Sequence, residues 1–192
     1  TNGLDYDYIT EYSYGMLESF NLFIPRFMGG GSGDPLPNDS KTIDEILKLG
    51  ASPQEANDIL SQLPAYWGDQ PIVAAPAYVG AIIIFLAVLA LFLVRGRLKW
   101  WITAAFLLSL FLSWGKNFSF LTELFIDYVP LYDKFRAVSS IQVIIELVLP
   151  VLAVVGLHQW FNSFVSDEKK QKALVQSVSI VGGITLIFIF FK

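Results

Sequence analysis

Residues 126–150 read IDYVPLYDKFRAVSSIQVIIELVLP and contain the change of composition that decides the fold. The first half is a polar, aromatic loop with four charged residues. It passes directly into an apolar run of membrane length that holds a single acid, Glu146. A lone carboxylate in hydrocarbon is costly unless it is paired, protonated or hydrated. This junction of loop and span is therefore the first candidate for a functional site.

The whole chain has the composition of a membrane protein. Of its 192 residues, 54% are hydrophobic and 15% aromatic, and the mean hydropathy is +0.54, which is too apolar for an ordinary water-soluble domain. The net charge is −4 and no basic stripe follows any face, so nucleic acid is not an expected partner. The absence of cysteine and the single histidine, His158, argue against a Cys-based or His-rich metal site and against a Ser-His-Asp triad. We predict no metal site and no cofactor in this stretch, although a divalent metal remains compatible with a longer polypeptide.

Hydropathy predicts an all-α membrane region over residues 77–192. The turn at residues 95–99 carries three basic residues, and the positive-inside bias places it in the cytoplasm. Residues 1–76 and the loop 116–136 are then extracytoplasmic, which suits a multi-pass membrane protein. We expect about four transmembrane helices, at residues 77–94, 98–115, 137–161 and 173–191.

The first region, residues 1–76, is predicted to contain a small helical hairpin. Its second helix has the start signals of a capping box, with Ser52 as N-cap, Pro53 at the first helical position and Glu55 three residues after the cap. The chain has neither an initiator methionine nor a signal peptide, and it ends within an apolar run. We therefore expect remaining segments of the same polypeptide to pack against it.

Two groups of side chains near the junction are candidate binding residues. Gln142 and Glu146 are four residues apart and share a helix face, which is typical of an intramembrane polar pocket or of hydrogen bonding between helices. The cations Lys116, Lys134 and Arg136 suit a lipid phosphate or diphosphate. They suit equally well ion pairs with the acids of the same loop.

The string YWGDQP at residues 66–71 places aromatic rings beside a carboxylate. Tyr66, Trp67 and Asp69 are therefore candidates for stacking on and hydrogen bonding to a sugar. The competing interpretation is an aromatic belt where the chain enters the bilayer.

Several strings together resemble the YfhO family of bacterial multi-span membrane proteins, especially forms from Bacteroidetes. They are LDYDYITEYSYG (4–15), FIP (23–25), YWGDQP (66–71), GRLKWW (96–101), LSWGKNF (112–118) and YDKFRAVSS (132–140). The resemblance covers most of residues 1–160, and the last span matches only as a hydrophobic segment.

This resemblance implies a relative of the GT-C glycosyltransferases, which take a sugar from a polyprenyl-phosphate carrier on the outer side of the membrane. The expected partners are membrane lipid and a polyprenyl-phosphate sugar, with Lys134 and Arg136 as phosphate ligands. The resemblance places the catalytic acid in an earlier outer loop, so the catalytic residue is unknown here. Two alternatives stay open: a transporter or lipid flippase with Gln142 and Glu146 along its pathway, and a structural subunit of an envelope complex.

Overall fold

The computed structural model describes residues 3–36 and 41–190, and every regular element in these ranges is a helix. The elements are α1 (Tyr6–Ile9), the 3₁₀ helix η1 (Leu17–Leu22), α2 (Lys41–Lys48), α3 (Pro53–Gln62), α4 (Ala81–Leu93), α5 (Leu98–Ser113), η2 (Gly115–Phe118), α6 (Ser119–Tyr128), η3 (Tyr132–Lys134), η4 (Val138–Ile141), α7 (Gln142–Phe161) and α8 (Asp167–Phe190). The prediction of an all-α chain is confirmed for these residues.

Two helices are long and apolar enough to cross a membrane, namely η4 with α7 over Val138–Phe161, and α8. A third span is present if α5 is joined to the segment Gly115–Tyr128, which bends away from it by 115°. Helix α8 begins at Asp167, before the predicted start at residue 173, and residue 191 lies outside the described residues. The predicted span 77–94 is helical only over the 13 residues of α4, or about 20 Å, which is shorter than a bilayer core.

Helix α4 starts late because the chain before it is attached to η1. The backbone N–H groups of Val79 and Gly80 both donate to the carbonyl oxygen of Leu22, at 3.2 Å each. Gly80 has a φ of +112°, which glycine adopts without the penalty that a Cβ brings. The first turn of the predicted span is thereby an extended segment that fastens residues 1–76 to the membrane region.

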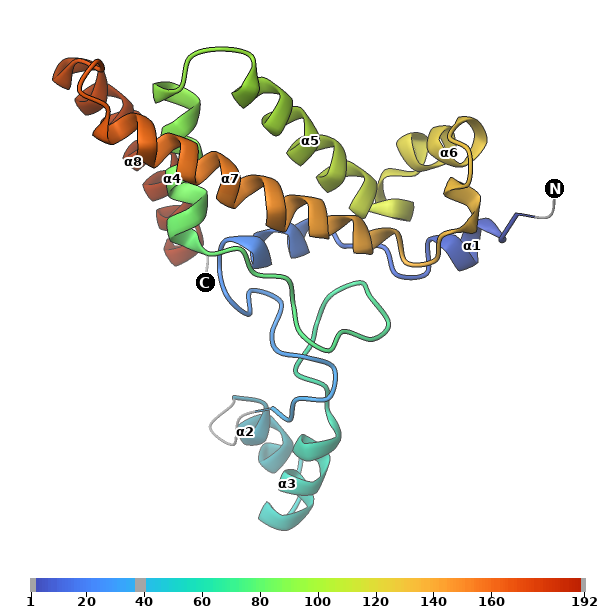
Figure 1. The fold of residues 1–192 in the computed structure, drawn as a ribbon. Coiled ribbons are helices and arrows are strands. Elements are labelled where there is room, and N and C mark those ends of the chain that lie inside the picture. The colour runs from blue at the N-terminus through green and yellow to red at the C-terminus, as the bar shows by residue number, and fades with distance from the viewer. Residues whose placement is uncertain (1–2, 37–40, 191–192) are drawn as a thin grey trace.

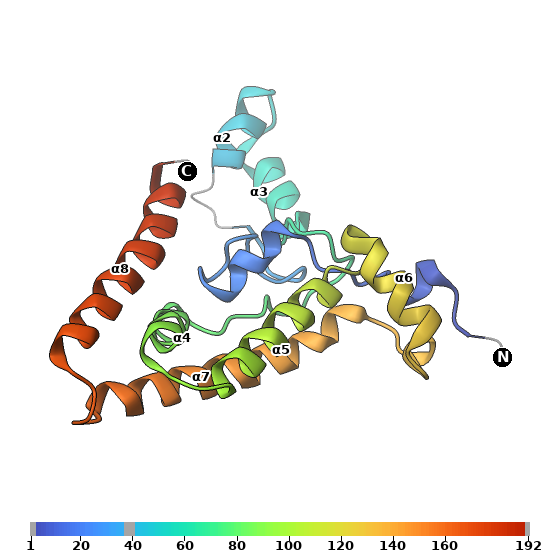
Figure 2. The same cartoon turned by 90° about the horizontal axis from the view of Figure 1, so that it is seen from above.

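The membrane region is a layer of α4, α5 and α7, with α8 crossing beside α4 (Figures 1 and 2). Close approach of α4 and α7 depends on Gly156, where a Cβ would lie 2.7 Å from Ala90 Cβ and 3.0 Å from the Leu86 carbonyl oxygen. Small residues at such crossings let helices in lipid pack closely, since lipid is as apolar as the helix surfaces. Helix α7 continues through Pro150 without interruption.

Helices α2 and α3 form the predicted hairpin and stand away from the membrane helices in both views (Figures 1 and 2). The capping box is present: the Glu55 N–H donates to Ser52 Oγ at 3.3 Å, and the Ser52 N–H donates to Glu55 Oε2 at 2.8 Å. Helix α2 ends before Gly50, whose φ is +96°. The local signals of the sequence were sufficient to predict this unit.

Candidate functional site

Polar segments far apart in the sequence meet at one end of the membrane layer, beside α1 and α6 (Figure 1). The backbone N–H of Tyr14 donates to the Ser113 carbonyl at 2.8 Å, and the Asn117 amide donates to the Tyr14 carbonyl at 3.0 Å. The Ser139 hydroxyl donates to Gln70 Oε1 at 3.1 Å. The segments joined in this way are residues 4–18, 66–71, 112–118 and 132–142, which include four of the strings that resemble the YfhO family.

Glu18 on η1 is the centre of this junction, and its side chain is 0% exposed. Its carboxylate accepts hydrogen bonds from the N–H of Gly15 at 2.5 Å, the N–H of Asp69 at 3.1 Å and the hydroxyl of Tyr66. A buried carboxylate is tolerated only with such partners. Gly68 leaves no room for a Cβ against the Glu18 carboxylate and the Tyr66 hydroxyl. Glu18 therefore fixes the loop 66–71.

This role of Glu18 was not predicted from the sequence. Its neighbours in LESFNLF (17–23) are mostly apolar, so the available signal was an acid among apolar residues. Burial, and next the hydrogen bond to Glu18, raise the pKa of Tyr66 above its ordinary value. Tyr66 stays protonated and donates to the carboxylate at neutral pH.

The three predicted sugar-binding residues have different environments. Tyr66 is 8% exposed and uses its hydroxyl internally, so its ring is not an open stacking surface. Trp67 is 66% exposed and lines a separate cavity with Arg26 and Ala65. Asp69 is exposed, accepts from the Asn117 amide at 3.0 Å and lines two cavities. Only Asp69 is placed where it can meet a ligand together with the predicted cations.

Arg136 is held by aromatic rings and an acid of the N-terminal segment. Its guanidinium donates to Glu11 at 2.5 Å and lies over the rings of Tyr8 and Tyr12, with centroids at 4.5 and 5.2 Å. Hydrogen bonding to Glu11 is the main cause of a raised Arg136 pKa. Both side chains are nearly half exposed, so the pair lies at the rim of the site.

The other two predicted cations are arranged differently. The Lys134 ammonium group lies 3.0 Å from the Asp133 carboxylate. This ion pair within the loop is the alternative to phosphate binding that the sequence left open. Lys116 has no ion pair among the described residues and lines a polar cavity of about 380 Å³ with Glu11 and Asp69. Lys116 and Arg136 thus flank the same acid, Glu11.

At the start of α7, Gln142 is buried while Glu146 is exposed. The Gln142 amide nitrogen, the Asn21 amide nitrogen and the Tyr14 hydroxyl are buried without hydrogen-bond partners among the described residues. Burial is the largest influence on Tyr14 and raises its pKa to about 12. The carboxylates of Glu18 and Glu146 also raise this pKa, whereas the side-chain amides of Asn21 and Gln142 lower it. Of the two residues predicted to form an intramembrane polar pocket, Gln142 is the buried one, and it lies near Tyr14.

Three neighbouring cavities run from the membrane layer to the polar junction. An apolar groove of about 680 Å³ lies between η1, α4, α5 and α7 and includes Met16 and Leu17 in its lining. The same two residues line a smaller cavity of about 260 Å³ that also includes Asp69 and Asn117 and whose lining is mostly apolar. Asp69 in turn lines a third cavity, the 380 Å³ cavity of Lys116, whose lining is about half polar. Neighbouring cavities thus share lining residues, and their lining changes from apolar to charged.

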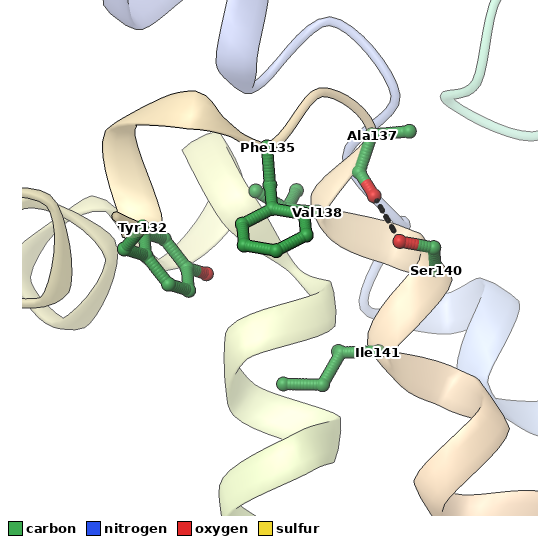
Figure 3. Close-up of a pocket in the computed structure, with 6 residues that line it drawn as sticks. All are labelled: Tyr132, Phe135, Ala137, Val138, Ser140 and Ile141. Atoms are coloured by element: carbon green, nitrogen blue, oxygen red, sulfur yellow. Dashed lines mark hydrogen bonds between the residues drawn. The ribbon is translucent and has the colours of Figure 1, made fainter. Parts of the chain in front are cut away.

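A fourth pocket, of about 250 Å³, lies in the loop that leads into α7 (Figure 3). The rings of Tyr132 and Phe135 and the side chain of Ile141 surround it, and the Ser140 hydroxyl donates to the Ala137 carbonyl at 2.7 Å. Its lining is largely apolar, and the Ser140 hydroxyl and the Ala137 carbonyl are already bonded to each other. The loop that carries Arg136 forms part of the wall of this pocket.

Within residues 3–36 and 41–190, no group of three or more His, Asp or Glu side chains is close enough to hold a metal ion. No protein-family model, curated protein or solved structure matches this chain. The resemblance to the YfhO family therefore stays a prediction.

Proposed function

We propose that this chain is part of a membrane-embedded, GT-C-like glycosyltransferase that uses a polyprenyl-phosphate sugar donor on the outer face of the bacterial inner membrane. The observation that carries the proposal is the series of cavities through Met16, Leu17 and Asp69. A lipid-linked sugar has the same order of parts, since an apolar tail is followed by phosphate and then by hydroxyl groups.

Each part of such a donor has a suitable environment in the series. The apolar groove matches an isoprenoid tail, whose burial is favoured by about 25 cal/mol per Å² of apolar surface removed from water. Lys116, which forms no ion pair among the described residues, supplies a positive charge for the phosphate in a cavity that Asp7, Glu11 and Asp69 also line. Asp69 and Glu11 supply acceptors for sugar hydroxyls. Arg136 positions Glu11 by donating a hydrogen bond to its carboxylate.

The proposal is tested by charge-neutral substitutions at Asp69 and Lys116 in the whole protein, produced in its bacterial host. Asp69→Asn and Lys116→Gln are expected to lower transfer of sugar to the surface glycan at least tenfold, with accumulation of the polyprenyl-phosphate sugar. The matched controls are Asp58→Asn and Lys48→Gln on the exposed hairpin α2–α3, which are expected to keep normal glycan. Normal glycan in the Asp69 and Lys116 variants, at equal protein level, would refute the proposal.

A lipid flippase or transporter is the second candidate, because Glu146 is exposed within a span-length helix and Gln142 has an unpaired amide. Intramembrane acids of this kind commonly relay protons or bind substrate. Glu146→Gln would then abolish pH-dependent lipid movement in reconstituted vesicles, while a glycosyltransferase would keep sugar transfer in this variant. A purely structural subunit would show neither effect and would instead co-purify with its partners.

A further inference from the structure

Basic side chains gather at the opposite end of the membrane layer from the polar junction. The turn from α4 to α5 and the turn from α7 to α8 both lie at this end, away from α1 and α6 (Figures 1 and 2). The two turns and the first residues of α8 carry six cations and two acids between them. They are Arg95, Arg97, Lys99, Lys169, Lys170 and Lys172, with Asp167 and Glu168.

Two of these cations meet at the end of α4. Lys99 from α5 donates to the Leu91 carbonyl oxygen at 2.6 Å, and Lys169 from α8 donates to the Leu93 carbonyl oxygen at 2.9 Å. These carbonyls belong to the last turn of α4, where no intrahelical donor remains. A helix C-terminus carries only about half of one negative charge. Two full ammonium charges therefore exceed what the helix end neutralises.

The surrounding groups increase this excess of positive charge. Arg95 lies close enough to Lys169 for the two cations to repel one another, and its own side chain has no ion pair among the described residues. The nearby acid Asp167 lies 4.0 Å from Lys170 instead. Glu168 is exposed and forms no ion pair within the described part of the chain. The charge that balances this cluster is consequently expected from outside the chain.

Exposed aromatic side chains show what surrounds the cluster. Trp100, Trp101, Phe161 and Phe164 flank the two turns, and each is at least 63% exposed. Large aromatic residues gather at this level of membrane helices because their rings lie among lipid head groups. The phosphate groups of membrane lipids are the anions concentrated at the same level.

We propose that Arg95, Lys99 and Lys169 form a binding site for the phosphate group of an anionic membrane phospholipid. Each lysine uses one of its three N–H donors on α4 and keeps the others for the ligand. The planar guanidinium of Arg95 can hold two phosphate oxygens at once. A bound lipid would join α4, α5 and α8 at one point. This site is separate from the proposed sugar-transfer site and does not depend on it.

The test measures lipid that stays bound after extraction. The whole protein is reconstituted in bilayers of phosphatidylcholine with a minor fraction of phosphatidylglycerol, and is then released in mild detergent. Native mass spectrometry counts the phosphatidylglycerol on each protein. Arg95→Gln is the variant of choice because Arg95 makes no side-chain hydrogen bond to the described residues, and Arg26→Gln, at the exposed pair with Asp34, is the matched control.

Wild type and Arg26→Gln are expected to retain phosphatidylglycerol in preference to phosphatidylcholine, and Arg95→Gln to retain about fivefold less, the effect of one basic residue at a membrane surface. Equal retention by the two arginine variants would overturn the site. Release of the lipid from wild type by millimolar inorganic phosphate would also overturn it, since the cluster would then be a site for free anions.

Discussion

Substitution of Glu18 by alanine is expected to release the loop 66–71 and to lower the stability of the whole polar junction. The change removes the acceptor of three donors: the buried N–H of Gly15, the buried hydroxyl of Tyr66 and the partly buried N–H of Asp69. Leaving a buried donor unpaired costs about 1–3 kcal/mol. Rearrangement of the loop will admit water to some of them, so we expect the free energy of unfolding to fall by about 3–5 kcal/mol in total.

Glu18→Gln separates the loss of charge from the loss of shape. The glutamine oxygen can still accept from the backbone N–H groups, but its amide faces the Tyr66 oxygen, which already accepts from the Gln70 N–H at 3.1 Å. We expect a smaller loss of about 1–2 kcal/mol, since one donor loses its partner and a charge-assisted bond becomes neutral. We therefore expect wild type to be the most stable, Glu18→Gln to be less stable and Glu18→Ala to be the least stable.

The assay is unfolding in mixed micelles with an increasing fraction of dodecyl sulfate, followed by circular dichroism, together with hydrogen exchange at the amide of Asp69. Glu45→Ala is the control, because Glu45 lies exposed on α2 and pairs only with Lys48, at 2.7 Å. A free energy of unfolding for Glu18→Ala within about 1 kcal/mol of the wild-type value, with unchanged hydrogen exchange at the Asp69 amide, would contradict this expectation. Glu18 would then not anchor the loop 66–71, and the position of Asp69 would need another cause.

Two further substitutions test the interior. Tyr14→Phe removes a buried hydroxyl that has no partner among the described residues, so stability at neutral pH is expected to stay level or rise by up to about 1 kcal/mol. Burial raises the Tyr14 pKa from 10.0 to about 12, so the fold favours the protonated form; wild type should lose stability as pH rises from 10 toward 12, and Tyr14→Phe should lose less over the same range. Gly156→Ala places a Cβ against α4 and is expected to destabilise by about 1–3 kcal/mol, whereas Gly182→Ala on α8 meets open space and should be neutral or stabilising. The same micelle titration measures Tyr14→Phe, Gly156→Ala and the comparison variant Gly182→Ala. Equal stability of the two glycine variants would contradict the close α4–α7 contact.

Local signals were enough for part of this protein. Hydropathy predicted the membrane helices around residues 137–161 and 173–191, and cap residues predicted the hairpin that ends in α3. The predicted spans 77–94 and 98–115 were less accurate, since α4 is a shorter helix and α5 ends at Ser113, after which the chain bends by 115°. Hydropathy averages over a window, so it cannot detect a chain that leaves the helix to bond with Leu22.

The candidate site was only partly predictable for the same physical reason. Asp69 and Lys116 were selected by residue type, and the structure places both in one cavity. Tyr66 was selected as a stacking ring, but its hydroxyl serves Glu18, which lies 48 residues away in the sequence. No periodicity or cap signal extends over that separation, because both describe neighbours within a few residues.

Composition and hydropathy along the chain therefore determined that the described residues form helices, two or three of them long and apolar enough to cross a membrane, because each residue's preference for hydrocarbon or water is its own property. Only the tertiary structure decided that Glu18 is buried, that Arg136 is held by Glu11, and that Asp69 lines two cavities, one of which shares Met16 and Leu17 with an apolar groove. These facts depend on which distant segments come into contact, and that choice follows from packing and the pairing of buried polar groups over the whole chain.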